Sequence, residues 1–247
     1  MAARSVFNIQ NDVPAAIGLG LIKEANQYEV FGARTGLISG VEEDISFLAA
    51  DTIPLPSNSG QQLEVVSTDA ADTQLIEFEA LGPGAVVIPN FSVNLNGTTP
   101  VLLPEALISR INEMENADLT PFLGTVNIQA AGAGAIFGTM RPEDQQMNQC
   151  MYTVPAGRRW LIKRLIGTLQ RSTGTENDLT LSILFKKFDG TAWRRPFAFG
   201  LQRSGDSSFD IENDYPSVGA GPVDIKLTAR SSVAGADVSG RINGLLL

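Results

Sequence analysis

Apolar and polar residues alternate in short runs along most of this chain, and a period of two is the pattern of half-buried β-strands. The clearest run is Asp178–Phe185, where leucine and isoleucine occupy every second position between threonine and serine. Other strand-length runs, bounded by turn-forming residues, cover 62–67, 74–79, 124–129, 196–201, 208–212 and 223–228. The pattern therefore predicts an all-β fold of many short strands.

The stretch from Tyr152 to Ile166 predicts a strand, a tight turn and a second strand. Pro155 fixes φ for the turn, and Gly157 supplies the backbone freedom that completes it. The apolar pattern resumes at Trp160 and is bounded by charged residues. A start of this kind is typical of an antiparallel β-sandwich or jelly roll.

Two segments of the first half raise more specific expectations. Alternating residues lead into Asn96-Gly97, the pair favoured in type I′ turns, so Phe91–Val101 predicts a hairpin. The next segment, Leu103–Glu115, is ambiguous. Pro104 and the spacing of its apolar residues favour one face of a helix, whereas tertiary context can turn such a segment into a strand.

The segmentation predicts two antiparallel β-sandwich or jelly-roll domains behind an extended N-terminal arm, with bounds of 1–45 for the arm, 46–148 for an acidic β-sandwich and 149–247 for a basic, jelly-roll-like β-domain. The arm is expected to be extended because Gly18 and Gly20 interrupt the apolar run Val13–Ile22 and would weaken a helix. The apolar end of the chain, Gly244–Leu247, predicts a buried last strand or a contact with a neighbouring subunit.

Composition then narrows the chemistry. None of the 247 residues is a histidine, which removes the commonest general base and metal ligand and rules out a Ser-His-Asp triad. The single cysteine, Cys150, cannot form an internal disulfide or a thiolate metal site. We read Cys150 as a small buried residue, with an intermolecular disulfide as the alternative. We expect no catalytic residue, no cofactor and no metal ion.

No apolar run reaches the roughly 18 residues of a membrane span, and no signal peptide is visible at the N-terminus. The sequence therefore predicts a protein that is made in a cytoplasm and has no membrane partner.

Charge is divided unevenly. Residues 1–149 hold 5 basic and 18 acidic residues, a net charge of −13, whereas residues 150–247 hold 13 basic and 9 acidic residues, a net charge of +4. Halves of opposite charge suggest head-to-tail contact between copies or docking onto surfaces of opposite sign. The alternative is that both halves simply solvate their surfaces. The basic residues of the second half come in adjacent pairs that a strand sends to opposite faces, so no nucleic-acid-binding stripe is expected.

Three segments could carry chemistry, and each has a plainer interpretation. Asp210–Asp214 offers carboxylates to a calcium ion but does not match an EF-hand loop, so a solvated turn is expected. The glycine-rich segment 130–138 lacks the spacing of a phosphate-binding loop. Trp160 and Trp193 are expected to be core residues rather than a platform for a sugar ring.

The order of several short motifs resembles a family of tailed-bacteriophage virion proteins, mostly of unassigned role. The resemblance touches most of the chain and rests on Tyr28–Gly32, Leu63–Thr73, Val93–Val101, Gly124–Ile128, Tyr152–Gly157 and Asp224–Arg230. It implies a β-rich, two-domain structural subunit of a phage particle with no enzymatic role, and a strand around Arg110. The chain departs from the family pattern after Asp72, where a glycine-rich stretch is missing.

We therefore expect a structural protein of a bacteriophage virion, and within that class a capsid decoration (cement) subunit that stabilises subunit junctions. The alternatives are a neck, tail or baseplate component and a receptor- or carbohydrate-binding β-module. The expected partners are other capsid or tail subunits and further copies of the chain, with a trimer favoured. The expected location is the virion, after assembly in the host cytoplasm.

The candidate partner-contact residues lie in the arm, in the basic stretch after Pro155 and at the C-terminus. They are Ile17, Leu19, Leu21, Arg158, Arg159, Arg164 and Leu247.

Overall fold

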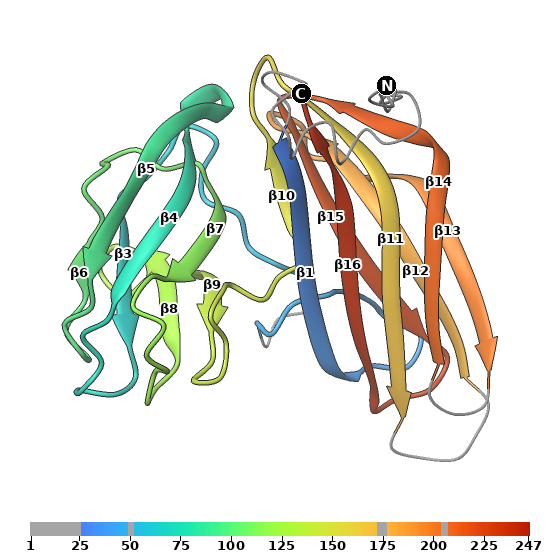
Figure 1. Cartoon of the computed structure of the whole chain (residues 1–247), viewed down its shortest axis with the longest axis horizontal. Helices are drawn as coiled ribbons and strands as arrows, with labels where there is room; N and C mark the ends of the chain where they lie inside the picture. The colour runs from blue at the N-terminus through green and yellow to red at the C-terminus, as the bar shows by residue number, and fades with distance from the viewer. Residues whose placement is uncertain (1–25, 49–51, 172–176, 204–206) are drawn as a thin grey trace, which may run out of the picture.

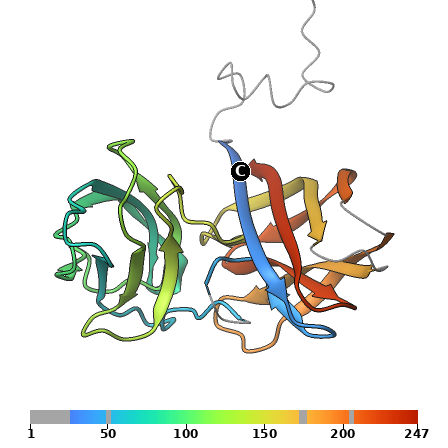
Figure 2. The ribbon, with the colours of Figure 1, turned by 90° about the horizontal axis from the view of Figure 1, so that it is seen from below.

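The computed structural model describes residues 26–48, 52–171, 177–203 and 207–247, which form two bodies lying side by side (Figure 1). Strands β3–β9 form the first body, which we call the N-terminal sandwich. Strands β1, β2 and β10–β16 form the second, which we call the C-terminal sandwich (Figure 2). Every pair of named strands is antiparallel, as predicted for an all-β fold.

Two sheets make up the C-terminal sandwich. Sheet A has the order β1 (Asn26–Leu37), β16 (Ala236–Leu246), β11 (Arg159–Arg171) and β14 (Ser207–Ala220). Sheet B has the order β10 (Met151–Val154), β15 (Val223–Ser231), β12 (Asn177–Lys187) and β13 (Arg194–Arg203), and β2 (Glu42–Asp44) also pairs with β15. Fully buried side chains such as Trp160, Leu181 and Ile225 fill the space between the sheets.

The strand order identifies this body as a jelly roll. Counted along the chain, β1 and β10–β16 are eight strands, which take the order 1-8-3-6 in sheet A and 2-7-4-5 in sheet B. That is the arrangement of two interleaved Greek keys. The N-terminal sandwich is consequently an insertion between the first and second strands of the jelly roll.

The N-terminal sandwich also has two sheets. One has the order β6 (Val101–Leu102), β3 (Leu63–Ser67), β8 (Val126–Ala130) and β9 (Ile136–Met140), and the other has the order β5 (Val86–Asn94), β4 (Leu75–Gly82) and β7 (Arg110–Asn116). A 3-10 helix, η1 (Pro83–Ala85), joins β4 to β5. The core of the N-terminal sandwich contains Leu63 and Ile128 from one sheet and Phe78 and Met114 from the other.

The strand-turn-strand prediction for Tyr152–Ile166 is confirmed, with one addition. The N–H of Arg158 donates to the carbonyl of Pro155 at 3.2 Å, and Gly157 has φ +79°. However, β10 and β11 belong to different sheets. The turn is therefore a corner that carries the chain from sheet B to sheet A.

The predicted hairpin over Phe91–Val101 is wrong. The chain does turn there, because the N–H of Thr99 donates to the carbonyl of Asn96 at 3.0 Å. The flanking strands separate, however, since β5 pairs with β4 and β6 with β3. Gly97 has φ +56°, the left-handed conformation expected for the turn, and a Cβ at this position would also lie 2.4 Å from the carbonyl oxygen of Ala70.

The ambiguous segment Leu103–Glu115 contains most of a strand, β7, and no helix. Ile111 and Met114 of β7 lie in the core of the N-terminal sandwich. Arg110 and Asn112 instead contact the jelly roll. Contacts on both faces override the helical spacing of the apolar residues.

The arm predicted for residues 1–45 differs from the structure where the structure describes it. Residues 26–37 are β1 and residues 42–44 are β2. Gly32 lies within β1, and only glycine fits there because a Cβ would come within 2.3 Å of the carbonyl oxygen of Ile45. Residues 1–25 lie outside the described residues, and the bounds 46–148 and 149–247 stay predictions.

Candidate functional site

A buried group of charged residues joins the two sandwiches. Asp224 of β15 accepts hydrogen bonds from Nε and Nη2 of Arg110, at 2.9 and 3.0 Å, and pairs with Nζ of Lys186 at 2.8 Å. Asp224 is fully buried and Arg110 is 1% exposed. Burial opposes ionisation of Asp224, but the hydrogen bonds and charges of Arg110 and Lys186 outweigh it and hold the pKa of Asp224 below its usual range.

Asn112 of β7 reinforces this junction by pairing with an edge strand. The N–H of Thr153 in β10 donates to Oδ1 of Asn112 at 2.9 Å, and Nδ2 of Asn112 donates to the carbonyl of Thr153 at 3.0 Å. The side-chain amide thus occupies the place of a neighbouring strand. It satisfies backbone groups that would otherwise leave the edge of sheet B open.

Aromatic residues continue the junction towards β1. Tyr28 and Tyr152 pack with ring centroids 4.2 Å apart, and Tyr152 meets Trp160 edge to face at 5.1 Å. The Tyr28 hydroxyl donates to Glu79 of β4 at 3.1 Å. Burial, together with the nearby Glu79, raises the pKa of both tyrosines, so the phenols stay protonated and can act as donors.

Among the described residues, the junction carboxylates Glu79 and Glu113 form no salt bridge, and Glu113 has the raised pKa. Glu113 of β7 lies opposite Glu79 and accepts a hydrogen bond from Gln146 at 3.0 Å. Burial and the charges of Glu79 and Glu115 raise the pKa of Glu113 to about 6. The adjoining cavity, of about 20 Å³, has room for little more than one water molecule.

Buried charge elsewhere in the described residues also holds elements together. The eight buried charged side chains, each with a hydrogen-bonded or ionic partner, are Glu43, Asp44, Glu64, Asp72, Arg110, Lys186, Asp224 and Lys226. None of them lines the cavity beside Glu113 or the two cavities on the outer face of sheet A. Six of the eight are in ion pairs, and Glu64 and Asp72 accept hydrogen bonds from neutral groups. This arrangement is typical of structural charges rather than of a catalytic centre.

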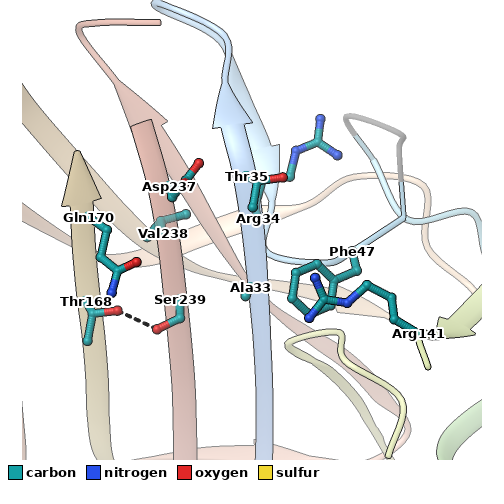
Figure 3. A pocket seen from close by; sticks show the side chains of 10 residues that line it. All are labelled: Ala33, Arg34, Thr35, Phe47, Arg141, Thr168, Gln170, Asp237, Val238 and Ser239. Atoms are coloured by element: carbon teal, nitrogen blue, oxygen red, sulfur yellow. Dashed lines mark hydrogen bonds between the residues drawn. The ribbon is translucent and has the colours of Figure 1, made fainter. Parts of the chain in front are cut away.

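Two adjoining hollows lie on the outer face of sheet A, and together we call them the sheet A groove. Two adjoining cavities, of about 260 and 270 Å³, share Ala33, Thr168 and Ser239 as lining residues. Ser239 pairs with Ala33 on one side and with Thr168 on the other, and the two hydroxyls lie 2.5 Å apart (Figure 3). This row of short side chains forms the floor.

Larger side chains flank the floor of the sheet A groove. Phe31 and Ile166 lie on one side with Arg241, the register partner of both. At the end next to β1, the Arg141 guanidinium lies 3.3 Å from the ring centroid of Phe47, and Figure 3 shows the two side chains stacked. The groove therefore has a mixed, largely apolar wall.

The charged residues of the groove already have partners. Arg241 pairs with Glu29 at 3.0 Å, Arg34 with Glu43 at 2.5 Å, Arg141 with Asp144 at 3.3 Å, and Asp237 accepts the Gly36 N–H at 2.8 Å. Three of these residues are in ion pairs, whereas the charge of Asp237 is met by a backbone N–H rather than by a cation.

The predicted partner-contact residues fall into three groups. Arg158, Arg159 and Leu247 meet at one end of the jelly roll, where the backbones of Arg159 and Leu247 exchange hydrogen bonds of 2.9 and 2.8 Å. Arg164 lies farther along β11, half-exposed and paired with Asp210. Ile17, Leu19 and Leu21 lie outside the described residues.

The opposite charges of the two halves are used partly within the chain. Asp44 pairs with Lys226 at 2.6 Å, Glu29 with Arg241 at 3.0 Å, and Glu42 with Arg195. Each pair joins an acidic residue of the first half to a basic residue of the second. Head-to-tail contact between copies stays a prediction, and the charges in these intramolecular pairs are not available for it.

The two segments considered as metal and phosphate sites, 210–214 and 130–138, make structural contacts instead. Residues 210–214 lie within β14 rather than in a turn, and Asp210 binds Arg164. The glycine-rich loop donates the N–H groups of Gly132 and Ala133 to Glu64, at 3.1 and 3.0 Å, so a carboxylate of the same chain occupies the position an anion would take. No group of three or more acidic or cysteine side chains in the described part of the chain could hold a metal ion.

The remaining singled-out side chains are packed. Trp160 is 0% exposed and cannot act as a sugar platform. The core prediction is wrong for Trp193, which is half-buried outside the hydrophobic clusters, with the Lys226 ammonium 4.4 Å from its ring centroid. Cys150 is buried as predicted, and burial raises the pKa of its thiol.

Within the described ranges, no helix is long and apolar enough to cross a membrane.

Comparison with known proteins gives little. No protein-family model matches the chain, and no curated protein matches it, so the resemblance to tailed-bacteriophage virion proteins stays a prediction. Among solved structures, the Sulfolobus Turreted Icosahedral Virus structure is 12% identical over 90% of this chain and 95% of the other, with a TM-score of 0.20.

Infectious bursal virus-derived T=1 particles are 12% identical over 91% of this chain and 70% of the other, with a TM-score of 0.26. The Gt strain of infectious bursal disease virus is 14% identical over 91% and 72%, with a TM-score of 0.23. With TM-scores this low, these similarities carry no argument, and the jelly roll rests on strand order alone.

Proposed function

We propose that the chain is a structural subunit of a virus particle that acts through protein–protein contact. Within that class we propose a capsid decoration (cement) subunit of a bacteriophage, located in the virion and assembled as a homo-oligomer, with a trimer favoured. The proposal assigns the chain no catalytic activity, no cofactor and no nucleic-acid or membrane partner.

One observation carries this proposal. Two β-sandwiches are locked together by buried charges, and the eight buried charged side chains of the described residues are all engaged in holding elements in place. An enzyme places at least some of its perturbed charges in a cavity that a substrate can enter. A jelly roll serves many functions, so it is the use of the charges, more than the fold, that favours a scaffolding role.

The proposed mechanism is adhesive. A subunit that bridges neighbours adds buried area across their junction, and a specific interface commonly buries about 1,600 Å². Such a subunit needs a rigid body, because ordering flexible parts on binding reduces the free energy gained. The junction around Asp224 supplies that rigidity, since moving one sandwich would separate a fully buried carboxylate from Arg110.

Quantitative mass spectrometry of purified particles of the encoding virus tests this proposal. A decoration subunit should be present in copy numbers comparable with those of the major capsid protein. A neck, tail or baseplate component should be present in about three to twelve copies, by point-group symmetry. A low copy number would overturn the decoration role, and absence from the particle would overturn the virion role.

A further inference from the structure

A buried lysine and a buried aspartate meet between β2 and β15, which are neighbours in sheet B but lie far apart along the chain. Nζ of Lys226 lies 2.6 Å from Oδ1 of Asp44, and the two side chains are 5% and 2% exposed. Because Oδ1 is bonded to Cγ, the lysine nitrogen lies beside the carbon that a nucleophile would attack. The pair therefore has the groups and the closeness from which an amide can form.

The residues beside Lys226 exclude water. Its register partners are Met151 on β10 and Leu184 on β12, which are 4% and 8% exposed. The ring of Trp193 packs against the lysine, with the ring centroid 4.4 Å from Nζ. Charged groups are disfavoured where water is excluded. A proton that passes along the hydrogen bond therefore leaves an uncharged amine beside a carboxylic acid, which is the reactive form of such a pair.

Asp44 is held in a way that suits attack at its carboxyl carbon. Burial raises the pKa of Asp44, and the charge of Glu42 adds to this effect. The opposing effects of Lys226 and of the Ile53 N–H are smaller, so the neutral acid is favoured. The N–H of Ile53 donates at 2.6 Å to Oδ2, the carboxyl oxygen that does not pair with the amine. A backbone donor in that position stabilises the negative charge that develops on an oxygen during attack.

The other buried lysine–aspartate pair lacks these features. Nζ of Lys186 lies 2.8 Å from Oδ2 of Asp224. That carboxylate also accepts hydrogen bonds from Arg110 and Thr153. Burial opposes its ionisation, but the hydrogen bonds and charges of its partners hold the pKa of Asp224 below the usual range. Because an ionised carboxylate resists nucleophilic attack, Asp224 serves as a matched, unreactive counterpart of Asp44.

We propose that Lys226 and Asp44 become joined by an isopeptide bond within the folded chain. The Nζ–Cγ bond forms and the Cγ–Oδ1 bond breaks. One proton of the ammonium group passes to Oδ1, and the amine then adds to Cγ. A second proton passes from the nitrogen to Oδ1, which leaves as water, and Oδ2 remains as the amide oxygen. The step consumes no oxidant, cofactor or other reactant.

Confinement favours this condensation. Two groups held in a productive orientation react as if at an effective concentration of about 10⁵–10⁸ M, and the exclusion of water opposes hydrolysis of the amide. The bond would tie β2, which leads into the N-terminal sandwich, to β15 in the interior of sheet B. A cross-link between positions so far apart along the chain constrains the unfolded state strongly. The inference goes beyond the proposed function and does not depend on it.

Mass spectrometry of the purified full chain, denatured before measurement, tests the proposal. The expected intact mass is that of the chain less one water molecule. A tryptic digest should contain one branched peptide that joins the segment with Asp44 to the segment with Lys226, without cleavage after Lys226. A chain that keeps the unmodified mass would overturn the proposal. Loss of water confined to Asp189-Gly190, where an aspartate can form a succinimide, would leave the two segments separate and would also overturn it.

Two lysine variants locate the reaction. Lys226→Arg keeps a positive charge beside Asp44 but removes the amine, so the loss of water and the branched peptide should both disappear. The matched control is Lys186→Arg, at the unreactive buried pair, which should retain both. A branched peptide that instead joins Lys186 to Asp224 would refute the assignment. The measurement on the unsubstituted chain decides the proposal even where a variant fails to fold.

Discussion

Neutralising Asp224 should be among the most damaging single changes to this protein. Asp224→Asn keeps the shape of the side chain but leaves the guanidinium of Arg110 and the ammonium of Lys186 without a counter-charge. These partners lie 2.8 to 3.0 Å from its carboxylate oxygens, and Thr153 also donates to Oδ1 at 2.7 Å.

The magnitude follows from burial. Breaking a buried ion pair by removing one partner costs about 3–5 kcal/mol. The side chain of Arg110 is 1% exposed and that of Lys186 is 10% exposed, so solvent can compensate little. We therefore expect Asp224→Asn to lower the free energy of unfolding by about 3–5 kcal/mol at pH 7.

Urea denaturation followed by tryptophan fluorescence and far-UV circular dichroism measures this change. Because the pair joins the two sandwiches, we also expect the two signals to lose coincidence in Asp224→Asn if the bodies separate before they unfold. The matched control is Arg164–Asp210, another arginine–aspartate pair, in which both side chains are about half-exposed. Asp210→Asn should leave the unfolding midpoint unchanged within error.

The pH dependence gives an independent check. The pKa of Asp224 is depressed in the folded protein, so its contribution is present above the unfolded pKa of about 3.9 and is lost as pH falls through the folded value. The difference between the wild-type protein and Asp224→Asn should therefore shrink below about pH 4. A difference below about 1 kcal/mol at pH 7 would refute the claim that this pair locks the junction.

Three further changes should have distinct signatures. Glu113→Gln should stabilise the protein above pH 6 by at most about 1 kcal/mol after solvent screening, because a group with a raised folded pKa loses stability as pH rises from about 4.3 through 6. The control is Glu77→Gln, at an exposed position, and the absence of a gain at pH 8 would contradict the reasoning. Asp72→Ala should cost about 1–3 kcal/mol in chemical denaturation, because it strands the N–H groups of Leu123 and Gly124, at 2.8 and 3.0 Å; a neutral result would exclude that role. Gly32→Ala should cost about 3 kcal/mol, since its Cβ would meet backbone atoms; an unchanged melting temperature would show that the strand can shift.

Local alternation predicted most of the strands. Runs such as Asp178–Phe185 and 223–228 are long enough for one face to meet a core, and they appear as β12 and β15. The sequence could not assign strands to sheets, because partners are chosen by contacts between distant segments. Phe91–Val101 shows this limit: its turn forms, yet its two strands enter different sheets.

The first jelly-roll strand, β1, was not predicted as a strand, because its inward-facing positions do not form a regular apolar pattern. That face of β1 includes Val30, Gly32 and Arg34, where the glycine admits a close backbone and the arginine pairs with buried Glu43. A helical or strand-like apolar stripe was therefore absent. The three acidic residues of β2, Glu42–Asp44, are typical of a solvated corner, yet Glu43 and Asp44 are buried and paired with Arg34 and Lys226. Their partners come from distant segments, so the local sequence does not reveal the burial.

The sheet A groove could not be predicted from the local sequence either. Its floor joins Ala33, Thr168 and Ser239, which lie far apart along the chain and become neighbours only through strand register. Each is unremarkable in its own segment, and short polar or small residues on an exposed face carry no sequence signal. The unpaired oxygen of Asn148 likewise becomes visible only once its surroundings are known.

The insertion explains why so much charge is buried at the junction. A body inserted between two adjacent strands of a jelly roll is tethered by two chain crossings, which fix its position but not its orientation. Apolar contact alone would tolerate sliding, because it is not directional. The bidentate Arg110–Asp224 pair and the amide of Asn112 impose direction, since a small rotation would break hydrogen bonds between groups that water cannot reach. Orientation, rather than net stability, is therefore the property for which these buried polar groups are suited.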